Sequence, residues 1–103
     1  MAFILIYVTH ADEQAAQDLV KHLVKERKIA CGNCFSMKSM YWWQTAIENE
    51  NEWVSILKTI PENWLICQER IEELHPYEVP CIIKIEAEAN EKYEEWIRES
   101  VGK

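Results

Sequence analysis

The segment ELHPYEVP, residues 73–80, places an imidazole, a phenol and two carboxylates beside two prolines. His75 stands where an expected helix ends, because the residue before a proline is pushed out of the α conformation. The negative end of the helix dipole favours a cationic ring or a bound cation there, and Tyr77 can present its hydroxyl to the same space. The structural alternative is that both side chains satisfy backbone groups at the helix end. The two roles are compatible, and His75 is a predicted cation ligand.

Glu52 and Lys58 lie six residues apart on an expected strand, so they share one face at a separation of roughly 20 Å. They cannot touch within one subunit, and a site that uses both must be completed by another chain. The sequence therefore predicts a ligand pocket between subunits, made by Glu52, Lys58, His75, Tyr77, Tyr41 and Trp43. An ion pair between subunits that fixes the assembly is the alternative role for Glu52 and Lys58.

His10 follows the first apolar segment and precedes an expected helix. Loop residues at strand ends often line binding sites, so His10 joins His75 as a predicted metal ligand. A lone imidazole rarely holds a metal firmly without a second ligand. We therefore expect no obligatory cofactor, with Cu²⁺ or another divalent cation as the candidate ligand.

The four cysteines are interpreted as reduced thiols. Cys31 and Cys34 have C-x-x-C spacing, but residues three apart on a strand point to opposite faces and do not converge on a metal. Cys67, in a helical apolar seam, and Cys81, on the face of a strand expected to point inward, are predicted to pack in the core. The opening segment, residues 3–8, has no basic flank and is too short to span a bilayer. These features predict a cytoplasmic protein.

Composition limits the classes of function. The chain has 103 residues, 49% of them hydrophobic, which predicts one domain over residues 1–103. A net charge of −7 repels phosphate backbones and anionic membranes, so neither nucleic acid nor a membrane is an expected partner. The chain lacks a G-x-S-x-G motif, a phosphate-binding glycine loop and paired catalytic carboxylates, so we expect no enzyme. The alternative is an enzyme that binds a small molecule in the pocket between subunits, with His75 or Tyr77 as acid or base and Lys58 holding an anion.

Periodicity predicts the elements that position these residues. Asp12 is an expected N-cap for a helix that ends near Lys28, and Pro76 ends a second helix that starts at Pro61. The expected strands cover residues 3–9 and 81–88 and a long hairpin between residues 29 and 60, and a last helix follows Asn90. The resulting order, β-α-β-β-α-β-α, predicts an α+β fold: a ferredoxin-like antiparallel sheet with helices on one face, plus a C-terminal helix.

The expected hairpin is unusual because both of its faces are apolar. Its turn is placed at Gln44 and Thr45, with residues 48–51 as the alternative. Phe35, Tyr41 and Trp43 share one face, while Met40 and Trp42 lie on the other. A strand of about fifteen residues reaches roughly 50 Å, beyond the edge of so small a domain. An aromatic strand pair with free edges predicts a closed, symmetric assembly of identical subunits.

Ordered motifs along the chain carry a family resemblance: residues 9–12, ERKIACGN, Tyr41 and Trp43, Glu52, Lys58 with Thr59, ELHPYEVP, Tyr93, and Trp96 with Ile97. With these motifs the chain resembles the CutA family of divalent-cation tolerance proteins over nearly its whole length. The resemblance implies a ferredoxin-like subunit that forms a homotrimer through its long hairpin strands. It also implies a link to copper and divalent-cation tolerance, as a weak metal binder, a scaffold or a sensor.

The chain departs from the family pattern where the pattern concerns metals. Metal-binding members of the family carry a Cys just before the first-strand Thr and a second His just before HPY, whereas this chain has Val8 and Leu74. Only His75 of that set is present. The family's usual proline after ACxN, turn glycine and acidic residue after the last proline of ELHPYEVP are replaced by Ser36, Thr45 and Cys81.

Overall fold

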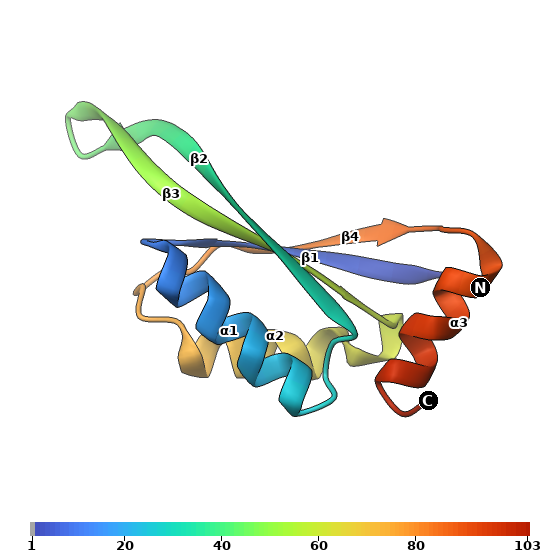
Figure 1. Cartoon of the computed structure of the whole chain (residues 1–103). Helices are drawn as coiled ribbons and strands as arrows, with labels where there is room; N and C mark the ends of the chain where they lie inside the picture. The colour runs from blue at the N-terminus through green and yellow to red at the C-terminus, as the bar shows by residue number, and fades with distance from the viewer. Residues whose placement is uncertain (1) are drawn as a thin grey trace.

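The computed structural model describes residues 2–103 and contains one four-stranded antiparallel sheet in the order β2-β3-β1-β4. The strands are β1 (Phe3–His10), β2 (Cys31–Trp43), β3 (Ala46–Thr59) and β4 (Ile82–Ala87). The helices are α1 (Glu13–Lys25), α2 (Trp64–Leu74) and α3 (Glu91–Ser100), with the short 3-10 turn η1 (Pro61–Asn63) before α2. Figure 1 shows α1 and α2 together on one side of the sheet and α3 at its end, beside the termini. The ferredoxin-like prediction is confirmed.

Helix α1 begins and ends where backbone groups find local partners. Asp12 caps its start, accepting the Ala15 N–H at 2.8 Å on Oδ1. The helix ends at Lys25, three residues before the expected end, because Arg27 takes a left-handed backbone with φ of 60°. The N–H groups of Lys28 and Ile29 then both reach back to the Leu23 carbonyl.

The core lies between α1, α2 and the central strands. Its buried side chains come from alternate β1 positions, from the inner stripes of the two helices, from β3 and from the segment after α1: Ile4, Ile6, Val8, Leu19, Leu23, Ile29, Leu57, Cys67 and Ile71. A second cluster of Phe3, Ile60, Ile97 and Val101 holds α3 against the end of the sheet where β1 begins and β3 ends. None of the helices within residues 2–103 has the length and apolar character needed to cross a membrane.

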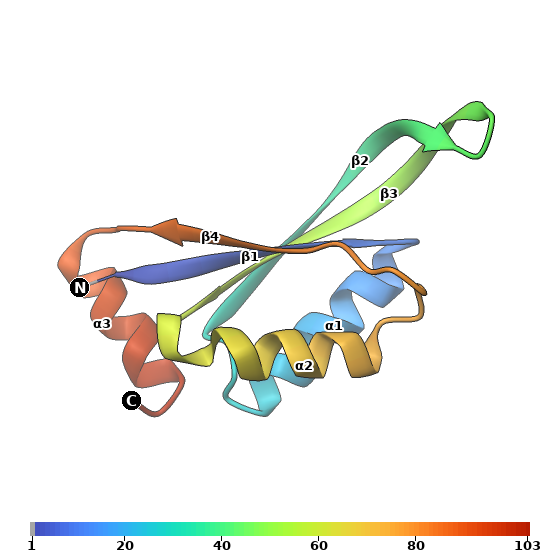
Figure 2. The ribbon, with the colours of Figure 1, turned by 180° about the vertical axis from the view of Figure 1, so that it is seen from behind.

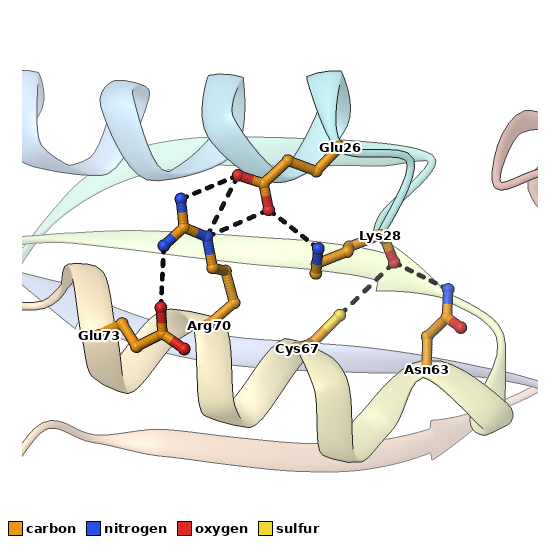
Figure 3. Close-up of polar contacts among 6 residues, drawn as sticks. All are labelled: Glu26, Lys28, Asn63, Cys67, Arg70 and Glu73. Atoms are coloured by element: carbon orange, nitrogen blue, oxygen red, sulfur yellow. Dashed lines mark hydrogen bonds and ion pairs between the residues drawn. The ribbon is translucent and has the colours of Figure 1, made fainter.

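A polar network ties the end of α1 to α2 (Figure 3). The Arg70 guanidinium donates to both carboxylate oxygens of Glu26 at 3.0–3.1 Å and to Glu73 at 3.0 Å. Below it, the Lys28 carbonyl accepts from Asn63 and from the Cys67 thiol. Hydrogen bonds from Arg70 and then Lys28 lower the pKa of Glu26 from 4.5 to about 2.

Strand β4 presents its residues opposite to the prediction. An inward-facing Cys81 places the alternate residues Ile83, Ile85 and Ala87 on the core side as well, but Ile83 is 47% and Ile85 is 43% exposed. The register explains the correction, because Ile82 pairs with Val8 and so shares its core-facing side. Of the expected inward set, Ala87 does pack, against the α3 cluster. Cys81 is half-buried rather than a core residue.

The hairpin of β2 and β3 extends past the body of the molecule, as Figure 2 shows from behind. Its turn falls at Gln44 and Thr45, which confirms the first choice, and Gln44 has a positive φ of 54°. Near the tip, Met40 is 71%, Trp42 70% and Trp43 62% exposed. Both faces of the tip therefore carry uncovered apolar side chains, as the sequence predicted.

Replacing Glu26 with Gln should remove a pH-dependent part of the stability. A carboxyl with a depressed folded pKa stabilises the fold above its unfolded pKa and loses that effect as pH falls through the folded value. The excess free energy of unfolding of the wild type over Glu26→Gln should therefore shrink as pH falls from 4.5 to about 2. Urea unfolding at fixed protein concentration measures this excess, with Glu69→Gln as the control. Parallel curves for the wild type and Glu26→Gln would contradict the role of Arg70.

Candidate cation-binding pocket

A cavity of about 830 Å³ lies between the hairpin and the loop that follows α2. Its walls carry four glutamates, two tyrosines and a tryptophan: Thr9, Ala11, Tyr41, Trp43, Glu48, Glu50, Glu52, Tyr77, Glu78, Val79 and Cys81 line it. We call this cavity the acidic pocket. Four residues of the predicted ligand pocket, namely Tyr41, Trp43, Glu52 and Tyr77, meet here within a single chain.

Strand geometry gathers the carboxylates. Glu48, Glu50 and Glu52 occupy alternate positions of β3, so their side chains leave the same face of the hairpin. The register pairs Glu48 with Tyr41, which adds a phenol to the same wall. The loop after α2 closes the pocket through Tyr77, whose hydroxyl donates to Glu52 Oε2 at 3.4 Å.

The acidic groups that line the pocket report a negative potential. Burial first, and then the Glu52 carboxylate, raise the pKa of Tyr77 to about 12. Burial together with Glu50, Glu52 and Glu48 raises the pKa of Tyr41. The pKa of the Cys81 thiol is raised by burial and also by Glu52. Burial is the first cause in each case and the glutamates add to it, so the row of carboxylates contributes a negative potential in the pocket.

His75 and His10 form a stacked pair behind the pocket, with ring centroids 5.4 Å apart. The Tyr77 N–H donates to Nδ1 of His75, so Nε2 carries the proton and donates to the Thr9 carbonyl at 2.6 Å. His10 Nε2 is 2.8 Å from Ser55 Oγ. Burial, and then His75, lower the pKa of His10 to about 4. His75 therefore performs the structural role weighed in the sequence, fixing the loop that carries Tyr77.

The predicted metal ligands His10 and His75 do not line the acidic pocket. The three histidines line a separate cleft of about 320 Å³ beside α1. Within residues 2–103, no group of three His, Cys, Asp or Glu side chains is arranged to hold a metal ion. Val8, at the family's Cys position, is fully buried, and Leu74 packs against the same core. Apolar packing thus occupies both positions at which the family resemblance would place further metal ligands.

Lys58 lies away from the acidic pocket. Its ammonium donates to the Tyr93 hydroxyl at 3.1 Å and sits 5.4 Å from the centre of that ring. In the sheet it is paired with Leu5 and Cys31, whereas Glu52 is paired with Met37. Within one chain Lys58 does not line the pocket that holds Tyr77, so the inter-subunit pocket of the enzyme alternative would need Lys58 from a second chain.

Sequence reasoning missed Glu48, Glu50 and Glu78 as pocket residues. The alternation of glutamates in the segment ENENE was a usable signal, because a period of two on a strand aligns side chains on one face. The same asparagine-rich segment also suits a turn, which hides the alternation. A turn at Gln44 and Thr45 leaves residues 48–52 on the strand, where the three glutamates form a row on one face.

The fold and the pocket together define a ferredoxin-like protein with a long hairpin and an acidic cavity beside its projecting part. Residues 4–100 match the family model described as CutA1 divalent ion tolerance protein. The chain is 45% identical over 101 residues to the divalent-cation tolerance protein CutA of Pyrococcus horikoshii, covering 97% of this chain and 99% of that protein. The chain therefore belongs to the CutA1 divalent ion tolerance family.

Solved structures agree with this assignment. The crystal structure of CutA1 from Pyrococcus horikoshii superposes with a TM-score of 0.93 at 44% identity, covering 97% of this chain and 99% of the other. A protein from Archaeoglobus fulgidus, described as the periplasmic divalent cation tolerance protein CutA, gives a TM-score of 0.92 at 32% identity. That match covers 96% of this chain and 98% of the other.

Replacing Glu52 with Gln should lower the pKa of Tyr77 from about 12, because the substitution removes the nearest negative charge. The pKa should stay above its ordinary value of 10.0, since burial remains the largest cause. The ¹³Cζ chemical shift of Tyr77 followed against pH measures the change. Glu69→Gln, an exposed carboxylate on α2, serves as the control. An unchanged Tyr77 pKa in Glu52→Gln would show that this carboxylate does not set the potential in the pocket.

Proposed function

We propose that the protein binds divalent cations, Cu²⁺ among them, weakly in the acidic pocket and acts in metal tolerance without catalysing a reaction. The observation that carries the proposal is the row of Glu48, Glu50 and Glu52 facing a cavity that Tyr77 and Glu78 close. The part of the raised pKa values of Tyr41 and Tyr77 that comes from these carboxylates supports a cation as the ligand. Weak binding is expected because no three carboxylates of the described residues are arranged to hold a metal ion directly, so the ion would keep part of its water shell. Glu50 and Glu78 are also exposed, and water competes for the ion there.

The oxygen-rich lining bears on the choice of ligands. Carboxylates suit hard divalent cations, while imidazole is preferred by Cu²⁺ and Zn²⁺. His75 would have to give up a backbone hydrogen bond to offer a ring nitrogen. We therefore place the first contact of the cation at the carboxylates and keep His75 and His10 as secondary ligands. No obligatory cofactor is part of the proposal.

We further propose that the whole chain, residues 1–103, is one domain and works as a homotrimer. Support comes from the uncovered apolar side chains Trp42, Ile47 and Ile83, which a symmetric partner could bury. In such an assembly the acidic pocket would lie between subunits, and Lys58 of a second chain could approach it. This is the arrangement in which the pocket predicted from the sequence would be complete.

We place the protein in the cytoplasm. All four cysteines are free thiols, as is usual in a reducing compartment. The Archaeoglobus fulgidus relative is described as periplasmic, so the compartment does not follow from the family. The net charge of −7 supports leaving nucleic acid and membranes out of the set of partners.

Calorimetric titration with Cu²⁺, Zn²⁺ and Mg²⁺ tests the cation site. The triple substitution Glu48→Gln, Glu50→Gln, Glu52→Gln should weaken binding by about tenfold or more, because affinity follows the number of charged ligands. A triple substitution of Glu69, Glu72 and Glu99 by Gln makes the same change in net charge elsewhere and should leave affinity within about twofold.

His75→Ala separates the imidazole from the carboxylates in the same titration. A smaller loss for His75→Ala than for the pocket triple variant agrees with the proposed order of ligands. Affinity that survives the pocket triple variant but falls in His75→Ala would move the site to the histidine pair. No binding of any of the three ions by the wild type would refute the cation proposal.

A further inference from the structure

A second cavity, of about 480 Å³, lies at the start of α3. Glu88, Ala89, Glu91, Glu94 and Glu95 line it. It shares no residue with the acidic pocket, and Figure 1 shows α3 at the opposite end of the molecule from the hairpin tip. Four carboxylates surround this cavity, yet none of them makes an ion pair within the part of the chain that the structure describes.

Glu94 is the unusual member of this group. Its residue surface is only 7% exposed, and its Oε2 accepts the Ala89 N–H at 3.3 Å. Its second oxygen, Oε1, is buried and has no hydrogen-bond partner among residues 2–103. A buried carboxylate oxygen without a donor is costly, and native structures contain few of them. This oxygen therefore calls for a donor from outside the chain.

The helix dipole explains only part of the cluster. Glu91 and Glu94 lie in the first turn of α3, where negative charge is favourable. That effect gives no reason for a further carboxylate at Glu88, before the helix, or for the missing partner of Glu94 Oε1. The clustered negative charge and the unpaired oxygen are separate observations. One ligand that carries both positive charge and a hydrogen-bond donor would account for both.

The ligand must combine positive charge with N–H donors. A directly bound metal ion does not fit, because no three carboxylates of the described residues converge closely enough. An ammonium group carries three donors and needs no fixed coordination geometry. Glu94 lines the cavity, and the terminal torsion of a Glu side chain is broad, so its carboxylate can turn Oε1 to accept from a ligand bound there.

We propose that the cavity at the start of α3 binds an alkylammonium group, with Glu94 as the acceptor and Glu88, Glu91 and Glu95 supplying the attracting charge. The group can belong to a free diamine or to a lysine side chain of another protein, since both offer the same chemistry. This site is independent of the proposed function, because it uses other residues and another ligand.

The test is a titration of the ¹⁵N-labelled full chain with 1,4-diaminobutane, and in parallel with Nα-acetyl-lysine N-methylamide. Amide signals of residues 88–95 should shift in a saturable way with at least one probe. Glu94→Gln should weaken binding by about tenfold or more, because Gln keeps an oxygen for the Ala89 N–H and turns a donor toward the ligand. Glu99→Gln, with the same charge change on the exposed face of α3, should bind within about twofold of the wild type.

The outcomes separate a binding site from a structural cap. If Glu94 served only to accept the Ala89 N–H, Glu94→Gln would bind the probes as the wild type does, and that result would overturn the proposal. The double variant Glu91→Gln, Glu95→Gln changes two exposed side chains and should also weaken binding. It therefore tests the proposal even if Glu94→Gln does not fold. Absence of saturable shifts with both probes, or equal shifts with Mg²⁺, would likewise overturn it.

Discussion

The β2–β3 hairpin is longer than the body that supports it, and the remaining features follow from that constraint. The molecule measures 47 × 24 × 21 Å, and the two strands pair from Cys31 with Lys58 to Trp43 with Ala46. Helices α1 and α2 cover only the part of the hairpin next to β1 (Figure 1). Beyond them, backbone hydrogen bonds hold the strands together while the side chains on both faces meet water. Covering the apolar side chains of this hairpin with another surface lowers the free energy of the protein.

The same hairpin creates the acidic pocket. A strand that stayed within the body would bury one face, and a row of glutamates at alternate positions would then have no place in it. On the projecting part, Glu48, Glu50 and Glu52 remain solvated while the loop after α2 comes close enough for Tyr77 to reach Glu52. The buried His75 fixes that loop through Tyr77 and Thr9. The motif HPY thus holds the loop in place through His75, and through Tyr77 it forms part of the wall of the acidic pocket.

The sequence predicted the order of elements, the hairpin turn and the uncovered apolar tip, because these follow from local periods and turn chemistry. It did not predict the orientation of β4, where Ile82 and Ile83 are adjacent and either face could be apolar. Lys84 lies on the core side of the strand, its ammonium 5.8 Å from the centre of the Trp64 ring, and a charged residue on that side hides the pattern. The contact of Tyr93 with Lys58 and the unpaired oxygen of Glu94 depend on the tertiary structure, so no local sequence pattern predicts them.

Sedimentation velocity across a dilution series, with circular dichroism on the same samples, tests most directly whether the hairpin needs identical partners. If identical subunits cover the hairpin as a trimer, a folded particle of three times the 12.2 kDa chain mass should persist to nanomolar concentration. A stable, folded particle of 12.2 kDa at that dilution would contradict it, because the exposed hairpin would then need no cover.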